Sequence, residues 1–191
     1  MENIPTPCKE EVEKYLKVWN DNEEFVEQEK CLDMFFKEKM KDNTDLYEIL
    51  VKVTLLNHFY GTNISNVYNV AKHIKELDID QRLKVKDETL VDDIARVKYG
   101  DKEIRFYSFA SKYCSFHYPE DYPLYDSYVE KVLAYFRDKD KFAIFLNKDL
   151  KDYSAFKRII IEFSKFYKID NYSLKQIDMY LWQFGKEYFK R

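Results

Sequence analysis

The stretch that decides the fold is Ser108–Leu133, with the sequence SFASKYCSFHYPEDYPLYDSYVEKVL. It holds seven aromatic side chains and is interrupted by two prolines, Pro119 and Pro123. Because proline cannot continue a helix, the segment from His117 to Pro123 is predicted to be a loop between two helices. Asp126 then stands where the second helix begins, in the position of an N-cap. The question raised by this stretch is whether Asp126 only caps a helix or also carries chemistry.

The composition of the 191 residues favours helices. Tyr (17) and Phe (15) are abundant, whereas Gly (3) and Pro (4) are scarce. Apolar residues recur at helical spacing along the whole chain, which predicts an all-α, compact bundle of about nine helices. The length suits a single globular domain over residues 1–191. We divide this domain into N-terminal helices (1–42), a core (43–138) and C-terminal helices (139–191).

Capping signals predict the ends of several helices. Thr6 with Pro7 is expected to begin the first helix, and Thr44 is expected to cap the third. Gly61 is predicted to end that third helix, because glycine readily adopts the left-handed conformation of a helix C-terminus. Thr62 or Asn63 is then expected to cap the next helix.

Strand signals are almost missing from the sequence. After a break near Lys86, a helix is predicted to run to about Lys98 and to end at Gly100, and a buried helix resumes at Ile104. The only candidate strand is Lys141–Leu146, KFAIFL, which could equally be helical.

No run approaches the roughly 18 apolar residues that span a bilayer. The start MENIPTPCKEEVEKY also lacks the regions of a signal peptide. We therefore expect a cytoplasmic protein that does not contact the membrane. Cys8, Cys31 and Cys114 are odd in number and lack C-x-x-C spacing, so free thiols are expected.

The sequence carries no recognisable motif for a metal or a cofactor. His58, His73 and His117 lie far apart, and no phosphate-cradling glycine motif is present. We expect no metal and no cofactor. Cys114 lies in an apolar helix, where burial usually makes a thiol inert.

The net charge of −3 conceals an asymmetry along the chain. Residues 1–50 carry a net charge of −7, residues 51–138 one of −1 and residues 139–191 one of +5. A polyanion such as double-stranded DNA is expected to prefer the middle and C-terminal parts. The acidic N-terminal helices instead suit a protein partner.

Two interpretations of Asp126 stay open at this point. As an N-cap, its side chain accepts a hydrogen bond from the first turn of the following helix. As a catalytic group, a carboxylate held at a helix N-terminus can activate water or stabilise a cationic, sugar-like transition state.

Two segments together carry a resemblance to a known family. Leu46–Ile74, LYEILVKVTLLNHFYGTNISNVYNVAKHI, is similar to an opening helix pattern in which Asn57 matches a serine and Phe59 or Tyr60 falls where a base-replacing Gln stands. YPLYDSYV, residues 122–129, is similar to a motif built around an aspartate. In these segments the chain resembles the helix-hairpin-helix (HhH-GPD) DNA glycosylase superfamily.

The resemblance implies an all-α glycosylase fold with Asp126 as the catalytic acid. Ser108 falls eighteen residues earlier, at the family's lysine position, so the resemblance implies base excision without strand cleavage. The hairpin is degenerate, since residues 101–106, DKEIRF, contain no glycine. The family's cluster-binding cysteines are missing, which agrees with the expectation of no cofactor.

The resemblance also implies a set of substrate and DNA contacts. Phe59 or Tyr60 would wedge into the base stack, and Asn57, Ser108 and Tyr125 would line the substrate site. Cations near the degenerate hairpin and at the basic C-terminal end would contact phosphate: Lys102, Arg105, Lys112 and Lys186.

Two alternatives belong to other functional classes. The first is a non-catalytic helical module of this fold that binds DNA or a protein. The second is a hydrolase of a nucleoside or small glycoside with an aromatic-lined pocket. The patterns LNxFYSTNI, SFASKYCSFHxPxxYPIYDSYV and LWQxGK also make the chain similar to an uncharacterised bacterial protein family.

Overall fold

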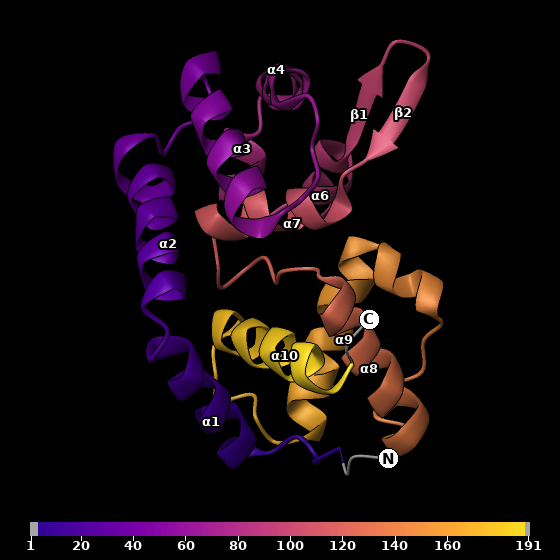
Figure 1. Ribbon diagram of the computed structural model, residues 1–191. Helices are drawn as coiled ribbons and strands as arrows, with labels where there is room; N and C mark the ends of the chain where they lie inside the picture. The colour runs from indigo at the N-terminus through magenta and orange to yellow at the C-terminus, as the bar shows by residue number, and fades with distance from the viewer. Residues whose placement is uncertain (1–3, 190–191) are drawn as a thin grey trace. The chain divides into compact units, whose positions relative to one another are not determined.

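The structure, a computed structural model, describes residues 4–189 and is mostly helical, as the sequence predicts (Figure 1). This part of the chain forms ten α-helices, a π-helix (η1), a 3-10 helix (η2) and one two-stranded sheet. It divides into two compact units, the first made of residues 4–25 and 123–189 and the second of residues 26–122. One division therefore falls inside the predicted core segment 43–138, between Tyr122 and Pro123.

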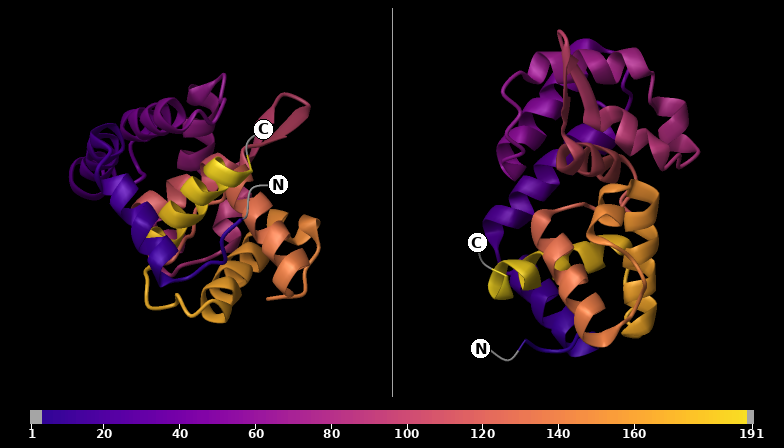
Figure 2. Two further views of the ribbon diagram at one scale, coloured as in Figure 1. Left: turned by 60° about the horizontal axis from the view of Figure 1, so that its bottom comes forward. Right: turned by 90° about the vertical axis from the view of Figure 1, so that its right-hand side faces the viewer.

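The first unit is a helical bundle made from both ends of the chain. It contains α1 (Lys9–Asn20), the start of α2 (Glu23–Asp33), α8 (Ser127–Asp140), η2 (Asn147–Lys151), α9 (Tyr153–Phe166) and α10 (Leu174–Tyr188). Helix α10 packs against both α1 and α8 (Figures 1 and 2). Aromatic rings fill its interior, where Phe136 contacts Phe163 and Phe184. Burial of these large apolar side chains is the main source of this unit's stability.

The second unit surrounds one buried helix, α7 (Tyr107–His117). The elements around it are the rest of α2, η1 (Met34–Lys39), α3 (Leu46–Tyr60), α4 (Val67–Leu77), α5 (Asp80–Lys84), α6 (Thr89–Ala95), β1 (Arg96–Tyr99) and β2 (Lys102–Arg105). Every α7 residue from Phe109 to Phe116 is buried. Helices α3 and α6 and the π-helix η1 pack directly on α7.

Several predicted helix ends are confirmed, but three predicted caps are wrong. Gly61 ends α3 with φ +55°, as predicted. Asp45, not Thr44, caps α3, because its carboxylate accepts hydrogen bonds from the backbone N–H groups of both Tyr47 and Glu48.

The other two wrong caps belong to α1 and α4. Helix α1 begins at Lys9 with Cys8 at the N-cap position, two residues later than the predicted cap Thr6. Asn66, rather than Thr62 or Asn63, caps α4 and accepts a hydrogen bond from Asn69 N. The residues predicted to cap α4 lie instead in the turn that closes α3.

The helix predicted to run to Lys98 is confirmed as α6 but ends at Ala95, because residues 96–105 form a β-hairpin. The helix predicted to resume at Ile104 likewise begins only at Tyr107, as α7. Strand β1 pairs with β2 in antiparallel register, with Arg96 opposite Arg105 and Tyr99 opposite Lys102. Gly100, with φ +62°, supplies the turn conformation that a two-residue connection requires. The hairpin projects from the helices of the second unit (Figures 1 and 2).

The candidate strand Lys141–Leu146 is also wrong, since the segment is a loop. Lys141 ends α8 in the left-handed conformation, with φ +56°. Phe142 and Phe145 are buried while Ile144 is fully exposed. A strand needs a hydrogen-bonded neighbour, and within residues 4–189 no strand lies beside this segment.

Within residues 4–189, no helix combines the length and the apolar character that crossing a lipid bilayer requires.

A close contact between α8 and α10 depends on a glycine. A methyl group at Gly185 would lie 2.8 Å from the Cβ atom and 2.9 Å from the carbonyl oxygen of Tyr128. Such distances are too short for carbon in a close-packed interior. Gly185 therefore allows α10 to approach the first turn of α8.

We predict that Gly185→Ala lowers the free energy of unfolding by about 1–3 kcal/mol, because the added methyl group forces the two helices apart. Denaturant unfolding of both proteins measures this difference. At an open helical position the same change would raise stability by about 1 kcal/mol. An unchanged or more stable variant would therefore contradict the close contact.

Candidate functional site

Asp126 stands directly before α8 in extended backbone, with φ −143° and ψ 153°. Its Oδ1 accepts a hydrogen bond of 2.8 Å from the backbone N–H of Tyr128, which confirms the predicted N-cap. The side chain is half-buried. The dipole of α8 is favourable for a negative charge at this end of the helix. The fold thus holds the carboxylate of Asp126 in a defined orientation.

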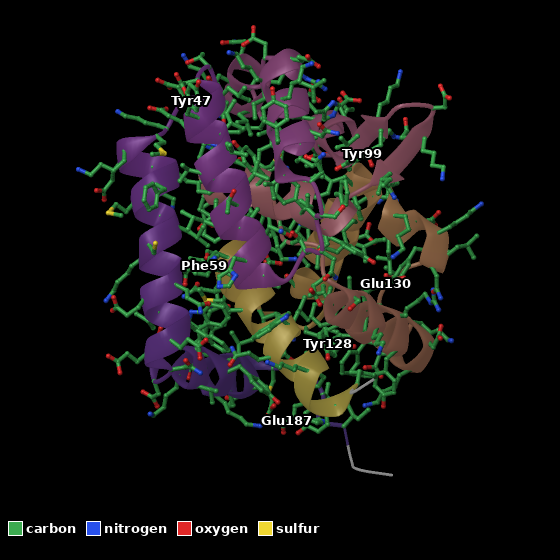
Figure 3. The ribbon with its side chains drawn as sticks, turned by 45° about the horizontal axis from the view of Figure 1, so that its top comes forward. Tyr47, Phe59, Tyr99, Tyr128, Glu130 and Glu187 are labelled. Carbon is green, nitrogen blue, oxygen red and sulfur yellow. The ribbon has the colours of Figure 1, made fainter. Side chains whose placement is uncertain are left out.

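Tyr125, predicted to line the substrate site, is tied into a polar cluster of the first unit. Its hydroxyl donates to the carboxylate of Glu130, which lies on α8 (Figure 3). Lys151 donates to the same tyrosine oxygen and to Glu130. The Tyr125 ring is 5% exposed and packs edge-on against Phe156. These contacts hold the backbone in place directly before Asp126. Tyr125 therefore positions this part of the chain.

Lys186, predicted to contact DNA, lies on α10 over a half-buried group of aromatic rings. Its Nζ is 4.6 Å from the centre of the Trp182 ring and 5.9 Å from that of Phe25. Trp182 in turn contacts Trp19 edge-on. This geometry is a cation–π interaction, and the ammonium group stays exposed to solvent.

Ser108, Lys112 and Tyr60 come together in the second unit. Lys112 lies on the buried helix α7 and is only 4% exposed. Its Nζ donates to Oγ of Ser108 at 2.7 Å and lies 5.5 Å from the centre of the Tyr60 ring. Lysine is almost never fully buried without partners. The sequence placed these three residues in one predicted site, and the structure brings them into contact.

The side chain of Asn57 holds the loop that follows α3. Its Nδ2 donates to the carbonyl of Ile64, and its Oδ1 accepts from Ile64 N and from Thr62 Oγ1. Both ends of the amide are therefore engaged by the loop after α3. Phe59 is half-exposed and lies at the C-terminal end of the same helix (Figure 3).

The hairpin presents a basic face that sequence reasoning only partly identified. Alternation along the strands places Arg96, Lys98, Glu103 and Arg105 on one face, and all four are exposed. Val97, on the opposite face, is 1% exposed. Of this face only Arg105 was predicted, whereas Arg96 and Lys98 were missed; Lys102, also predicted, pairs with Tyr99 on the opposite face. The signal for Arg96 and Lys98 was the alternation of polar and apolar residues from Arg96 to Tyr99.

A buried polar network in the second unit was not predicted. Lys52 is 0% exposed, and its Nζ donates to Met40 O at 2.8 Å and to Asp42 O at 2.9 Å. It also donates to Oδ1 of Asn43 at 2.7 Å, and the Tyr113 hydroxyl donates to the same oxygen at 2.6 Å. A buried charge is tolerated only when its hydrogen bonds are satisfied. These acceptors satisfy Lys52 and hold residues 40–43 in place.

The network fixes which ring nitrogen of His117 carries a proton. Because Lys52 can only donate, the Asn43 atom that it contacts is Oδ1, and Nδ2 lies on the other side. Nδ2 donates to Oδ1 of Asp80 at 2.6 Å and lies 3.3 Å from Nε2 of His117. Nε2 of His117 therefore accepts this hydrogen bond. The proton of the neutral ring is on Nδ1.

Burial shifts the titration of several groups in this unit. It lowers the pKa of His117, an effect to which nearby Lys52 contributes, so the imidazole is neutral at physiological pH. Burial raises the pKa of the Cys114 thiol, so this cysteine is a poor nucleophile. Among residues 4–189, no group of His, Cys, Asp and Glu side chains could hold a metal ion.

Two comparisons with known proteins find relatives of this chain. The family model HI_0787_N, described as an N-terminal domain, matches residues 11–121, which end before Asp126. A protein of Haemophilus influenzae, named only as an uncharacterized protein, is 47% identical over 151 residues. That match covers 78% of this chain and 72% of the relative. No solved structure shows a significant match.

The buried ammonium of Lys52 generates a pH-dependent prediction. Burial lowers its pKa from 10.5 to about 8 in the folded protein, with nearby carboxylates opposing the shift. The unfolded chain thus binds more protons between about pH 8 and 10.5, so this residue's contribution to the free energy of unfolding rises with pH. We expect the free energy of unfolding of wild type, relative to that of Lys52→Met, to increase by roughly 2 kcal/mol when the pH is raised from 7.5 to 9.5.

Urea unfolding at the two pH values measures this shift. Lys72→Met, which changes an exposed lysine of α4, is the matched control and should show no such pH dependence. A constant difference between wild type and Lys52→Met would show that Lys52 keeps its ordinary titration in the folded state.

Proposed function

The chain belongs to the HI_0787_N family, and from the contacts of its own residues we propose that it is a DNA glycosylase-like protein. The reaction is monofunctional hydrolysis of the N-glycosidic bond of a modified base. The observation that carries this function is the carboxylate of Asp126, held by Tyr128 N at the start of α8. The resemblance of the segment around Asp126 to the aspartate motif of helix-hairpin-helix glycosylases adds support.

The chemistry uses Asp126 to stabilise positive charge on the sugar. As the bond from C1′ to the base nitrogen breaks, the sugar gains oxocarbenium character, which a nearby carboxylate stabilises. Asp126 also orients a water and accepts its proton as the water oxygen bonds to C1′. The proton then passes to the released base. The hydroxyl group of the water thus ends on C1′ and its proton on the base. Asp126 is regenerated as a carboxylate.

Ser108 supports hydrolysis over strand cleavage. A Schiff base requires an amine, and Ser108 supplies a hydroxyl that accepts a hydrogen bond from Lys112. The serine at position 108 therefore supplies no Schiff-base nucleophile, which favours hydrolysis of the N-glycosidic bond.

The β-hairpin is the element of the second unit best suited to DNA. Its exposed face carries Lys98, Arg96, which pairs with Glu103 at 3.6 Å, and Arg105, which pairs with Asp92. A two-stranded ribbon fits the major groove of B-DNA, and exposed cations neutralise phosphate charge. Phe59, half-exposed at the end of α3, is an apolar side chain of the kind that wedges between base pairs.

A non-catalytic binding module is the second candidate. Asp126 has a sufficient structural role as the N-cap of α8. The exposed basic face of the hairpin suits nucleic acid, and the acidic residues of α1 and α2 suit a protein. In this alternative the chain binds a partner without breaking a bond.

We predict that Asp126→Asn abolishes base excision while leaving the fold intact. Asparagine caps helices as well as aspartate does, so stability should change by less than about 1 kcal/mol. The lost charge should lower excision at least 100-fold. The measurement is abasic-site formation in duplexes that carry uracil, oxidised, alkylated or hypermodified bases.

Asp152→Asn is the matched control for this experiment. Asp152 caps α9 in the same unit by accepting a 2.8 Å hydrogen bond from Ala155 N, and its substitution should leave excision unchanged. Excision that survives in Asp126→Asn would refute the catalytic role. A wild-type protein that binds duplexes without excising any base would support the non-catalytic module.

A second prediction concerns the hairpin. Replacing Arg96 and Lys98 by serine should weaken duplex binding and reduce the slope of log affinity against log salt concentration by about 2. Fluorescence anisotropy over a salt series measures both quantities. The control replaces Lys72 and Lys75, two exposed lysines of α4, by serine. Equal slopes for the two double variants would exclude the hairpin as the phosphate contact.

A further inference from the structure

Residues 123–126 lead into α8 and belong to neither a helix nor a strand. Backbone N–H and C=O groups that are shielded from water need hydrogen-bond partners. In a helix or a sheet, the backbone itself provides most of these partners. Here side chains from other elements of the first unit bind the backbone of the segment. These side chains therefore determine how the chain enters α8.

Asp178, on α10, binds the first N–H group of this segment. Its Oδ2 accepts a hydrogen bond of 2.7 Å from the backbone N–H of Leu124. Asp178 is only 2% exposed, and aspartate is almost never buried to this extent unless it has partners. Hydrogen bonds to a carboxylate are shorter and stronger than those between neutral groups. This contact therefore fixes the backbone two residues before Asp126.

Tyr153, the first residue of α9, binds the other side of the same peptide group. It is 0% exposed, and its hydroxyl donates to the carbonyl oxygen of Pro123 at 2.9 Å. Pro123 O and Leu124 N belong to one peptide group, which is planar and rigid. Two buried side chains, one from α9 and one from α10, thus hold its two polar atoms. The orientation of this peptide plane is fixed on both sides.

The contacts continue from this peptide group to Asp126. The hydroxyl of Tyr125 is bound by Glu130 and Lys151. The carboxylate of Asp126 comes next and accepts from the backbone N–H of Tyr128. Each of the residues 123–126 is therefore held by at least one hydrogen bond, which limits how far the backbone can rotate the carboxylate.

We propose that Asp178 and Tyr153 are positioning residues for the carboxylate of Asp126. This inference rests on the proposed function, since it concerns the group that stabilises positive charge on the sugar. Asp178 and Tyr153 act through the backbone of residues 123–125. A displacement of about 1 Å can lower a rate by about 100-fold. The loss of either contact is therefore expected to slow excision without weakening the binding of DNA.

A purely structural role of the two side chains predicts a different result. Loss of stability would lower the fraction of folded protein, while the excision rate of each folded molecule would stay the same. A positioning role lowers that rate and leaves the affinity for the duplex unchanged. Single-turnover excision rates at saturating protein concentration, measured beside duplex affinity, therefore separate the two roles.

Asp178→Leu, which removes the acceptor for Leu124 N, should lower the single-turnover rate at least tenfold and keep duplex affinity within twofold of wild type. Asp178→Asn should stay within threefold of the wild-type rate, because its side-chain oxygen still accepts the hydrogen bond. The matched control is Gln183→Leu. Gln183 is buried on the same helix and donates to Tyr15 O at 2.9 Å. This control loses a similar contact to another segment and should excise at the wild-type rate.

Tyr153→Phe removes only the hydroxyl that binds Pro123 O and should lower the rate at least fivefold. Its control is Tyr180→Phe. Tyr180 is also 0% exposed, and its hydroxyl has no hydrogen-bond partner within residues 4–189, so the wild-type rate is expected. Equal rates in these two variants, or equal losses in Asp178→Leu and Gln183→Leu, would overturn the positioning role.

Amide hydrogen exchange at Tyr128 tests the positioning without any reaction. Because this N–H group donates to Asp126, its exchange should be at least tenfold faster in Asp178→Leu than in Gln183→Leu. Equal exchange in the two variants would overturn the inference. A wild type that excises no base, together with the expected change in exchange, would refute the proposed reaction and still support the hold of Asp178 on Asp126.

Discussion

The three hydrogen bonds donated by the buried ammonium of Lys52 order much of the second unit. They tie α3 to residues 40–43, which connect η1 to α3, and they orient the side-chain amide of Asn43. That orientation links Asn43 to Asp80 at the start of α5 and to His117 at the end of α7. Removing one partner of such a network leaves another buried polar group unsatisfied, which costs about 1–3 kcal/mol for each group. The network therefore acts as a unit.

The sequence predicts those parts of the fold that depend on neighbouring residues. The helix end at Gly61 and the loop between α7 and α8 were predicted because local backbone chemistry dictates them, although His117 itself is still the last residue of α7. The hairpin was missed because four residues of alternation, from Arg96 to Tyr99, are too few to outweigh the surrounding helical pattern. The Lys52 network leaves one trace in the sequence, a lysine between Ile49, Val53 and Leu56 on an apolar helix face. Its partners Asn43 and Tyr113 are brought to it by the fold.

The candidate site was predictable to a similar extent. Asp126 was identified as an N-cap from Pro123 and the helical pattern that follows, and the structure confirms this. The contact of Lys112 with Ser108 follows from their spacing of one helical turn. The engagement of Asn57 by Thr62 and Ile64 was not predictable from the resemblance. The matching position in a motif identifies a residue, but its hydrogen-bond partners depend on the loop that follows.

Tyr128 connects the carboxylate of Asp126 to the end of the chain. Its backbone N–H holds Asp126, while its Cβ atom and carbonyl oxygen face Gly185 of α10. A proteolytic fragment ending before Leu174 would keep the whole segment matched by the family model and Asp126 itself. It would nevertheless lose the surface on which the first turn of α8 rests. The smallest fragment that can preserve the geometry of Asp126 therefore includes the last helix, more than forty residues further along the chain.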